Sequence, residues 1–190
     1  MKILVSAAKT GGHIFPAIAV GNKLKHNGHD LVFISSGAPI EINAWKKTCF
    51  SYYLISMEGF RGKNFLGKIK SLLLIPISIF KILKIIRNEK VDAMIGFGGF
   101  ITVPVGIAFY ISRKPIFIHE QNAILGSANK LLGKFSKIIF SAFKLKETFT
   151  NTCITGNPIR EEFRTDISKD DYSEITKIYI TGGSQGSEYI

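Results

Sequence analysis

The stretch Lys2–Ser35, KILVSAAKTGGHIFPAIAVGNKLKHNGHDLVFIS, decides the fold of this chain. It opens with a short apolar run at Lys2–Ser6, passes through a Gly-rich loop into a helical pattern over Ile14–His26, and ends in a second apolar run at Leu31–Ser35. The turn signal Asn27-Gly28 closes the helix. A strand, a helix and a second strand in this order predict a parallel βαβ unit.

The same alternation continues along the chain. Further strands are predicted at Tyr52–Ser56, Val91–Phe97, Pro115–His119 and Lys137–Ser141, and further helices at Glu41–Thr48, Leu66–Asn88, Ile101–Ser112 and Ala123–Phe135. This alternation predicts an α/β fold with a parallel sheet and helices on both faces. Right-handed crossovers then place the strand-to-helix loops along the carboxyl edge of the sheet, where ligands bind.

Near the end of the chain the pattern starts afresh. The polar stretch Arg164–Glu174 predicts a linker, Lys177–Thr181 predicts a strand, and Gly182–Gly186 is a Gly-rich turn of the kind that precedes a phosphate-binding helix. A length of 190 residues suffices for one sizeable core and the beginning of a second domain. We therefore expect one domain over residues 1–163, and a linker with the truncated opening of a second domain over residues 164–190.

The composition limits which classes of protein this chain can belong to. The chain has 25 basic and 14 acidic residues and a net charge of +11, which suits nucleic acid, anionic lipid or phosphorylated ligands. No apolar run reaches the ~20 residues of a membrane span, and the N-terminal run is too short for a signal peptide. The two distant cysteines, Cys49 and Cys153, fit reduced thiols. We expect a cytosolic protein that lies on a membrane without crossing it.

The segment Leu66–Lys90, LGKIKSLLLIPISIFKILKIIRNEK, is both apolar and cationic. One interpretation is a core helix with a solvated basic face. However, apolar residues nearly encircle the helix around Leu72–Ile75, which favours a helix at the surface of an anionic bilayer. Nucleic-acid binding accounts for the charge but not for the apolar residues, so no nucleic-acid partner is expected. The predicted membrane residues are Leu72, Leu73, Ile75, Ile79 and Phe80, with Lys68, Lys70, Lys81 and Lys84.

Two Gly-rich loops follow predicted strands. Thr10-Gly11-Gly12-His13 opens the first predicted helix, and Phe97-Gly98-Gly99-Phe100 stands in the same position further on. Glycines let a backbone approach a ligand, and the N–H groups at a helix start attract anions. Together the two loops are suited to flank a diphosphate, although either alone is equally well a tight turn without a ligand.

Polar residues also follow the strand at Pro115–His119. In His119-Glu120-Gln121-Asn122, local hydrogen bonding accounts for His119 and Gln121, whereas Glu120 and Asn122 are the better candidates for ligand contact. Arg160, after the turn Thr155–Ile159, is either a phosphate clamp or a solvated side chain.

Five ordered motifs carry a resemblance to a known family. They are TGGHIFPAIAV (Thr10–Val20), GFGGF (Gly96–Phe100), HEQN (His119–Asn122), TGNPIR (Thr155–Arg160) and TGGSQG (Thr181–Gly186). Together they resemble the MurG family of N-acetylglucosaminyltransferases, which convert lipid I to lipid II in peptidoglycan synthesis. The resemblance implies the N-terminal half of a GT-B fold, in which two Rossmann-like domains face each other across a cleft.

The resemblance also implies roles for individual residues. The positions that match donor contacts to UDP-N-acetylglucosamine are Thr10, Gly11, Gly12, Asn122, Arg160 and Ser184; those that match the site of the acceptor diphosphate are His13, Gly98, Gly99 and Phe100, with Glu120 beside them. The family inverts at the anomeric carbon and needs neither an active-site metal nor a cofactor. His13 is the candidate base because an imidazole titrates near neutral pH, or it binds and orients only. Glu120 is a second catalytic candidate.

The first loop departs from the family pattern at Ala8 and Lys9, where relatives carry glycine, and Phe100 stands where tyrosine is common. A positive φ at Ala8 or Lys9 would be strained by about 1 kcal/mol. Because the donor site belongs mainly to the second domain, the chain alone is expected to be inactive. Two alternatives stay open: an acceptor-binding subunit that works with a separate donor-domain chain, and a non-catalytic remnant docked on the cytoplasmic face of the membrane.

Overall fold

The computed structural model describes residues 1–8, 10–57, 64–147 and 149–163. Within these residues, seven strands form one sheet in which all neighbouring strands are parallel. The strands are β1 (Lys2–Ser6), β2 (Asp30–Ser35), β3 (Ser51–Leu54), β4 (Ala93–Gly96), β5 (Ile116–Glu120), β6 (Ile138–Ser141) and β7 (Thr152–Ile154). Their order in the sheet is β3-β2-β1-β4-β5-β6-β7, so the direction of winding reverses between β1 and β4.

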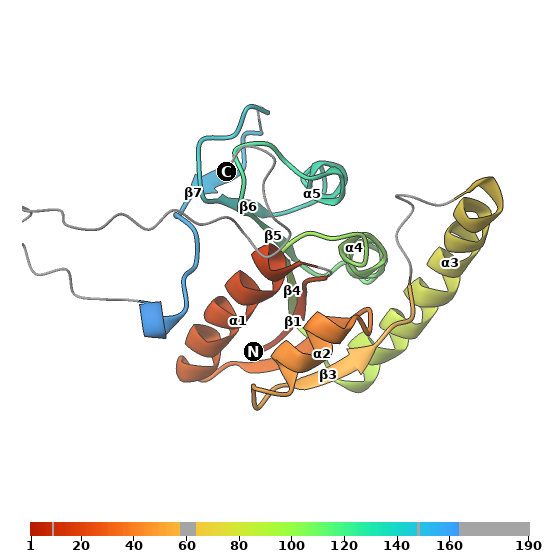
Figure 1. Cartoon of the computed structure of the whole chain (residues 1–190), viewed down its shortest axis with the longest axis horizontal. Helices are drawn as coiled ribbons and strands as arrows, with labels where there is room; N and C mark the ends of the chain where they lie inside the picture. Colours follow the sequence, from red (N-terminus) through yellow and green to blue (C-terminus); the bar gives the residue numbers. More distant parts are fainter. Residues whose placement is uncertain (9, 58–63, 148, 164–190) are drawn as a thin grey trace, which may run out of the picture.

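Helices lie on both faces of the sheet, as the sequence predicted. They are α1 (Gly11–His26), α2 (Pro39–Trp45), α3 (Phe65–Asn88), α4 (Thr102–Ile111) and α5 (Ser127–Leu132), followed by a short 3-10 helix at Glu161–Phe163. Figure 1 shows α1 and α2 on one side of the sheet and α3, α4 and α5 on the other. The first turns of α3 project beyond the rest of the domain (Figure 1).

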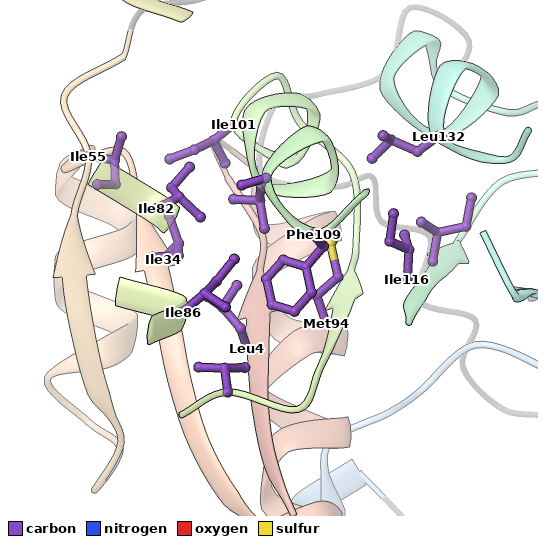
Figure 2. Packing of buried hydrophobic residues seen from close by; sticks show 14 of the residues in the cluster. Leu4, Ile34, Ile55, Ile82, Ile86, Met94, Ile101, Phe109, Ile116 and Leu132 are labelled. Atoms are coloured by element: carbon purple, nitrogen blue, oxygen red, sulfur yellow. The ribbon is translucent and has the colours of Figure 1, made fainter. Parts of the chain in front are cut away.

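Each side of the sheet has its own hydrophobic core. On the side of α1 and α2, Phe33 packs against Trp45 with ring centroids 4.5 Å apart. On the other side, buried residues of α3 and α4 cover the central strands, and Figure 2 shows Phe109 of α4 beside Met94 of β4. Burial of aromatic and branched side chains on both faces stabilises a parallel sheet. The stable sheet holds in place the strand ends that carry the candidate site.

The structure corrects two sequence predictions. The helix predicted over Ala123–Phe135 is limited to Ser127–Leu132, because the residues before it form a loop around the Glu120 carboxylate. The short strand β7 was not predicted, since Thr152–Ile154 is half-buried or exposed at the sheet edge and lacks an apolar run. The predicted linker, the strand Lys177–Thr181 and the Gly182–Gly186 turn lie outside the described residues.

Among the described helices, none is long and apolar enough to span a membrane.

Candidate functional site

A cavity of about 500 Å³ opens at the carboxyl edge of the sheet, beside the point where the strand order reverses. Parallel α/β sheets bind ligands in this crevice. The cavity is lined by six of the residues predicted for the active site, namely His13, Gly98, Gly99, Phe100, Glu120 and Asn122. The predicted convergence of the loops after β1, β4 and β5 on one cleft is therefore confirmed. The N-termini of α1 and α4 both begin at this edge, which suits an anionic ligand.

His13 presents one ring nitrogen to the cavity. Its Nδ1 lies 3.1 Å from the carbonyl oxygen of Ala8 and 3.1 Å from the Thr10 hydroxyl. Because a carbonyl oxygen can only accept, this contact places the proton of the neutral ring on Nδ1. Nε2 then keeps its lone pair, and it faces the Gly98 loop, where an added Cβ would lie 3.0 Å from it. This is the orientation that a general base or a hydrogen-bond acceptor needs.

The loop after β4 requires both of its glycines. Gly98 has φ of +94° and Gly99 has φ of +81°, a region in which other residues are strained. Space is short as well, because a Cβ on Gly99 would approach Ala8 to 3.1 Å. The Thr102 hydroxyl holds the loop by donating to the carbonyl oxygen of Gly98 at 2.7 Å. The sequence therefore brings this backbone against the first loop without an intervening side chain.

The carboxylate of Glu120 organises the loop between β5 and α5. It is 2 % exposed, and four N–H groups donate to it. Oε1 accepts from the backbone and side-chain nitrogens of Asn122 at 3.1 and 2.9 Å, and Oε2 accepts from the backbone of Gly126 and the side chain of Asn129, both at 2.9 Å. These bonds occupy the acceptor positions of both oxygens, so the geometry favours a positioning role over proton transfer.

His119 is a structural residue, in agreement with the local bonding inferred from its sequence position. Its Nε2 lies 3.3 Å from the carbonyl oxygen of Gly156, and its Nδ1 lies 3.3 Å from the side-chain nitrogen of Gln121. Burial lowers the pKa of His119 below its ordinary value, against smaller raising effects of the Gly156 carbonyl and the Glu120 charge. The neutral ring thus ties the end of β5 to the loop after β7.

Sequence reasoning missed Asn129. This residue of α5 is buried, lines the cavity, and donates to Oε2 of Glu120 and, at 3.1 Å, to the carbonyl oxygen of His119. Its own Oδ1 has no hydrogen-bond partner among the described residues. In the sequence, Asn129 stands seven positions after Asn122 and inside a predicted helix. A polar side chain in a helix usually faces solvent, so its position offered no reason to place it in the site. Apolar lining comes from Met57, Ile75 and Leu131.

One predicted donor residue, Arg160, lies apart from this cavity. The guanidinium of Arg160 stacks over the Phe15 ring at 4.6 Å and pairs with Glu162 at 2.7 Å, next to a different hollow between α1 and α2. Ser184 lies outside the described residues. Thr10 is adjacent to the cavity through its contact with His13, and Gly11 and Gly12 form the first turn of α1.

The structure accommodates Ala8 and Phe100, the two described residues that depart from the family pattern. Ala8 is fully buried against Gly99, and the described non-glycine residues with positive φ are Lys90 and Arg113, so Ala8 is not strained in this way. Phe100 is half-buried and lines the cavity. Lys9 lies outside the described residues.

The predicted membrane segment is divided between core and surface. Leu73 and Phe80 are 66 % and 63 % exposed, Ile77 is also exposed, and the ammonium of Lys84 lies 5.7 Å from the centre of the Phe80 ring. Ile75 and Ile79 are half-buried and pack against the core. Lys81 and Lys84 are exposed, whereas the side chains of Lys68, Lys70 and Leu72 are outside the described set.

The sheet order and the cavity at its reversal define the N-terminal domain of a glycosyltransferase with the GT-B fold. Residues 3–141 match the Glycosyltransferase family 28 N-terminal domain, and the chain belongs to this family.

Its curated relatives include the UDP-N-acetylglucosamine–N-acetylmuramyl-(pentapeptide) pyrophosphoryl-undecaprenol N-acetylglucosamine transferase of Haemophilus influenzae (strain PittEE). That enzyme is 38 % identical over 197 residues, covering 100 % of this chain and 54 % of the relative. The transferase of the same name from Sulfurihydrogenibium sp. (strain YO3AOP1) is 34 % identical and covers 98 % of this chain and 55 % of the relative. The chain therefore spans about half the length of these relatives.

Among solved structures, Acinetobacter baumannii MurG superposes with a TM-score of 0.74 at 31 % identity, covering 82 % of this chain and 46 % of that protein. The predicted resemblance to the MurG family is confirmed.

Proposed function

We propose that this chain is the acceptor-binding half of a transferase that moves N-acetylglucosamine from UDP-N-acetylglucosamine to lipid I, giving lipid II. The observation that carries the proposal is the cavity in which His13 Nε2 faces the Gly98 loop between two helix N-termini. The names and sequences of the relatives support the donor and the acceptor as substrates.

The chemistry assigned to the cavity is an inverting displacement. The muramyl 4-hydroxyl attacks C1 of the donor sugar, its proton passes to a base, and UDP departs with the electrons of the broken bond. His13 Nε2 is the described group best placed to receive that proton, because its lone pair faces the cavity. The acceptor diphosphate is proposed to lie along the Gly98-Gly99 loop, where the absence of side chains leaves backbone N–H groups accessible.

Glu120 is proposed to position this site and not to transfer protons. Its carboxylate fixes the Asn122 backbone and side chain at the cavity wall. Asn122 remains a candidate contact for the donor, together with Thr10, Gly11 and Gly12. Arg160 and Ser184 are proposed as donor contacts only in the presence of a second domain, since Arg160 lies by Phe15 in this structure.

The exposed part of α3 is proposed to bind the cytoplasmic face of an anionic membrane, without crossing it. Its apolar residues Leu73, Ile77 and Phe80 are exposed beside Lys81 and Lys84. The same helix reaches the proposed active site, because Ile75 of α3 lines the cavity. A lipid-linked acceptor would thus enter the cavity from the bilayer surface.

Acceptor binding tests the proposal directly. The chain is titrated calorimetrically with a water-soluble lipid I analogue that keeps the diphosphate, and with a matched analogue in which an uncharged linker replaces it. We expect saturable binding of the first and much weaker binding of the second. Equal binding of the two analogues would contradict the assignment of the diphosphate to the glycine loops.

A further inference from the structure

The cavity at the carboxyl edge of the sheet has two unlike groups of lining residues. One group belongs to the loops described above, with His13, the Gly98-Gly99 backbone and Asn122. The second group, which we call the apolar set, consists of Met57, Ile75, Val103, Pro104, Ala128 and Leu131. The proposed diphosphate site uses the first group and leaves the apolar set without a role.

The helices α4 and α5 lie on the same face of the sheet (Figure 1), and their packing shapes the apolar set. A Cβ on Gly106 of α4 would lie 2.4 Å from Cδ2 of Leu132 of α5, so the helices approach closely here because Gly106 has no side chain. Val103 and Ala128 stand about one turn nearer the N-terminal ends, on the same faces as Gly106 and Leu132. Both line the cavity. The space between the two helices is therefore closed at Gly106 and opens toward the carboxyl edge.

The apolar set is accessible to a ligand. Ile75, Val103 and Ala128 are half-buried, and Leu131 is 45 % exposed. By contrast Leu132, the next residue of α5, is 2 % exposed and belongs to the hydrophobic core. The apolar set is thus part of the cavity surface and not of the closed core.

The chemistry of the apolar set selects its occupant. Among the described lining residues of the cavity, the ionisable ones are His13 and Glu120, which lie outside this set. A sugar or a peptide has hydroxyl and amide groups that would lose their hydrogen bonds to water against such a surface. A hydrocarbon group is stabilised there by burial. The cavity volume of about 500 Å³ is that of a small-molecule site, so it suits the beginning of a long hydrocarbon chain.

We propose that the apolar set binds the first isoprene units of the acceptor's polyprenyl chain. This inference rests on the proposed function, in which the acceptor, lipid I, is a diphosphate ester of undecaprenol. The first isoprene unit of such an ester is bonded directly to a phosphate oxygen. A diphosphate at the Gly98-Gly99 loop therefore places this unit inside the same cavity. The rest of the chain leaves past Ile75, toward the exposed residues Leu73 and Ile77 of α3.

Calorimetric titration of the 190-residue chain with two soluble diphosphates tests the proposal. Neryl diphosphate carries the first isoprene units of a polyprenyl chain, whereas methyl diphosphate carries none. We expect neryl diphosphate to bind at least about tenfold more tightly, which is the effect of burying about two CH₂ groups. Equal affinities for the two compounds would overturn the proposal.

Two substitutions in α5 locate the contact. Leu131→Gln places an amide on the apolar set, and Ala128→Leu fills the space beside it. In both variants the ratio of the two affinities should fall toward one. Ile124→Gln is the control, because Ile124 is 52 % exposed in the loop before α5 and is not among the described lining residues of the cavity. Thermal unfolding checks that the variants fold. A ratio that keeps its parent value in both α5 variants would place the prenyl contact elsewhere and contradict the proposal.

Failure of this subsite and failure of the proposed function give different results. If methyl and neryl diphosphate bind equally well, the subsite is wrong and the assignment of the diphosphate to the glycine loops stands. If nerol, which lacks the diphosphate, binds as tightly as neryl diphosphate, the subsite stands and the diphosphate assignment is wrong. Competition of a soluble muramyl pentapeptide with nerol would place the sugar or the peptide on the apolar set and overturn the proposal.

Discussion

The side-chain nitrogen of Asn129 lies 2.9 Å from Oε2 of Glu120, so a residue of α5 holds a carboxylate at the end of β5. The same nitrogen lies 3.1 Å from the carbonyl oxygen of His119. A single amide therefore joins the helix to the strand end beside the cavity at the carboxyl edge of the sheet. The loop between them takes its shape from these bonds, which is why Glu120 is assigned a positioning role.

Replacing Glu120 with Gln should destabilise the chain by about 2 kcal/mol or more, because an amide cannot accept from four donors and the lost bonds are charge-assisted. The free energy of unfolding in urea measures this effect. In a double-mutant cycle, Glu120→Gln and Asn129→Ala should be coupled by about 0.5–3 kcal/mol. A variant of Glu120 with unchanged stability and a large loss of transfer rate would instead assign the carboxylate to the chemistry.

Gly98→Ala should disturb the cavity beyond its effect on stability. The positive φ alone should cost about 1 kcal/mol, and the new methyl group would press on the His13 ring. Gly28→Ala is the matched control, because Gly28 has φ of +80° with no atom within 4 Å of an added Cβ.

Both glycine variants should lose stability in urea unfolding, Gly98→Ala at least as much as Gly28→Ala, whereas only Gly98→Ala should weaken binding of the diphosphate-bearing acceptor analogue. Equal analogue binding by the two variants would argue against the glycine loop as the diphosphate site.

Stability should fall as the pH drops from about 7.5 to about 5.5, in the range where an ordinary histidine takes up its proton. Burial lowers the pKa of His119 in the folded chain. The unfolded chain therefore binds more protons in this range, and protonation favours unfolding. The stabilising contribution is present above the ordinary value of 6.5 and is lost as the pH falls through the lowered value. Urea unfolding at both pH values measures the slope.

Replacing His119 with Asn should flatten this pH dependence, and His26→Gln, at an exposed position of α1, is the control. The same slope in the His119 variant as in the parent would show that another group is responsible.

The membrane surface of α3 is tested at its exposed positions. Leu73→Gln with Phe80→Gln should strongly reduce co-sedimentation with anionic vesicles, because each buried apolar side chain contributes about 1.5–3 kcal/mol. The control pair is Leu54→Gln with Ile154→Gln, because these residues are also more than half exposed, on the edge strands β3 and β7. High salt should weaken binding by the parent chain. Comparable losses in both pairs would remove α3 as the specific contact.

Most of the sheet could be predicted from the sequence because its central strands β1, β2, β4 and β5 are largely buried and appear as short apolar runs. The predicted and observed bounds of β1 agree. Those of β2 differ by one residue at the first end, and those of β5 differ by one residue at each end. β7 was missed because its residues Thr152–Ile154 are not buried and carry no apolar pattern. Its pairing with β6 depends on the sheet that is already formed.

The candidate site was predictable only in part. The loops at His13 and Gly98 could be placed on one edge because each follows a strand, and parallel strands share their carboxyl edge. The bonding of Glu120 could not be foreseen, since its partners Gly126 and Asn129 lie within a predicted helix. Side-chain hydrogen bonds over six to nine residues leave no periodic signal. The orientation of Arg160 over Phe15 likewise depends on tertiary contact.

A transfer assay with UDP-N-acetylglucosamine and a lipid I analogue tests the proposed reaction. Residues 1–190 are assayed alone, mixed with the separately expressed second half of the Haemophilus influenzae relative, and fused to it, with the full-length relative as positive control. We expect product only when the second half is present, because a GT-B site is closed by two domains. We also expect His13→Ala to lower kcat by about 10²- to 10⁴-fold, the loss typical of removing a general base. Turnover by residues 1–190 alone, or an unchanged kcat in the His13→Ala fusion, would contradict these expectations.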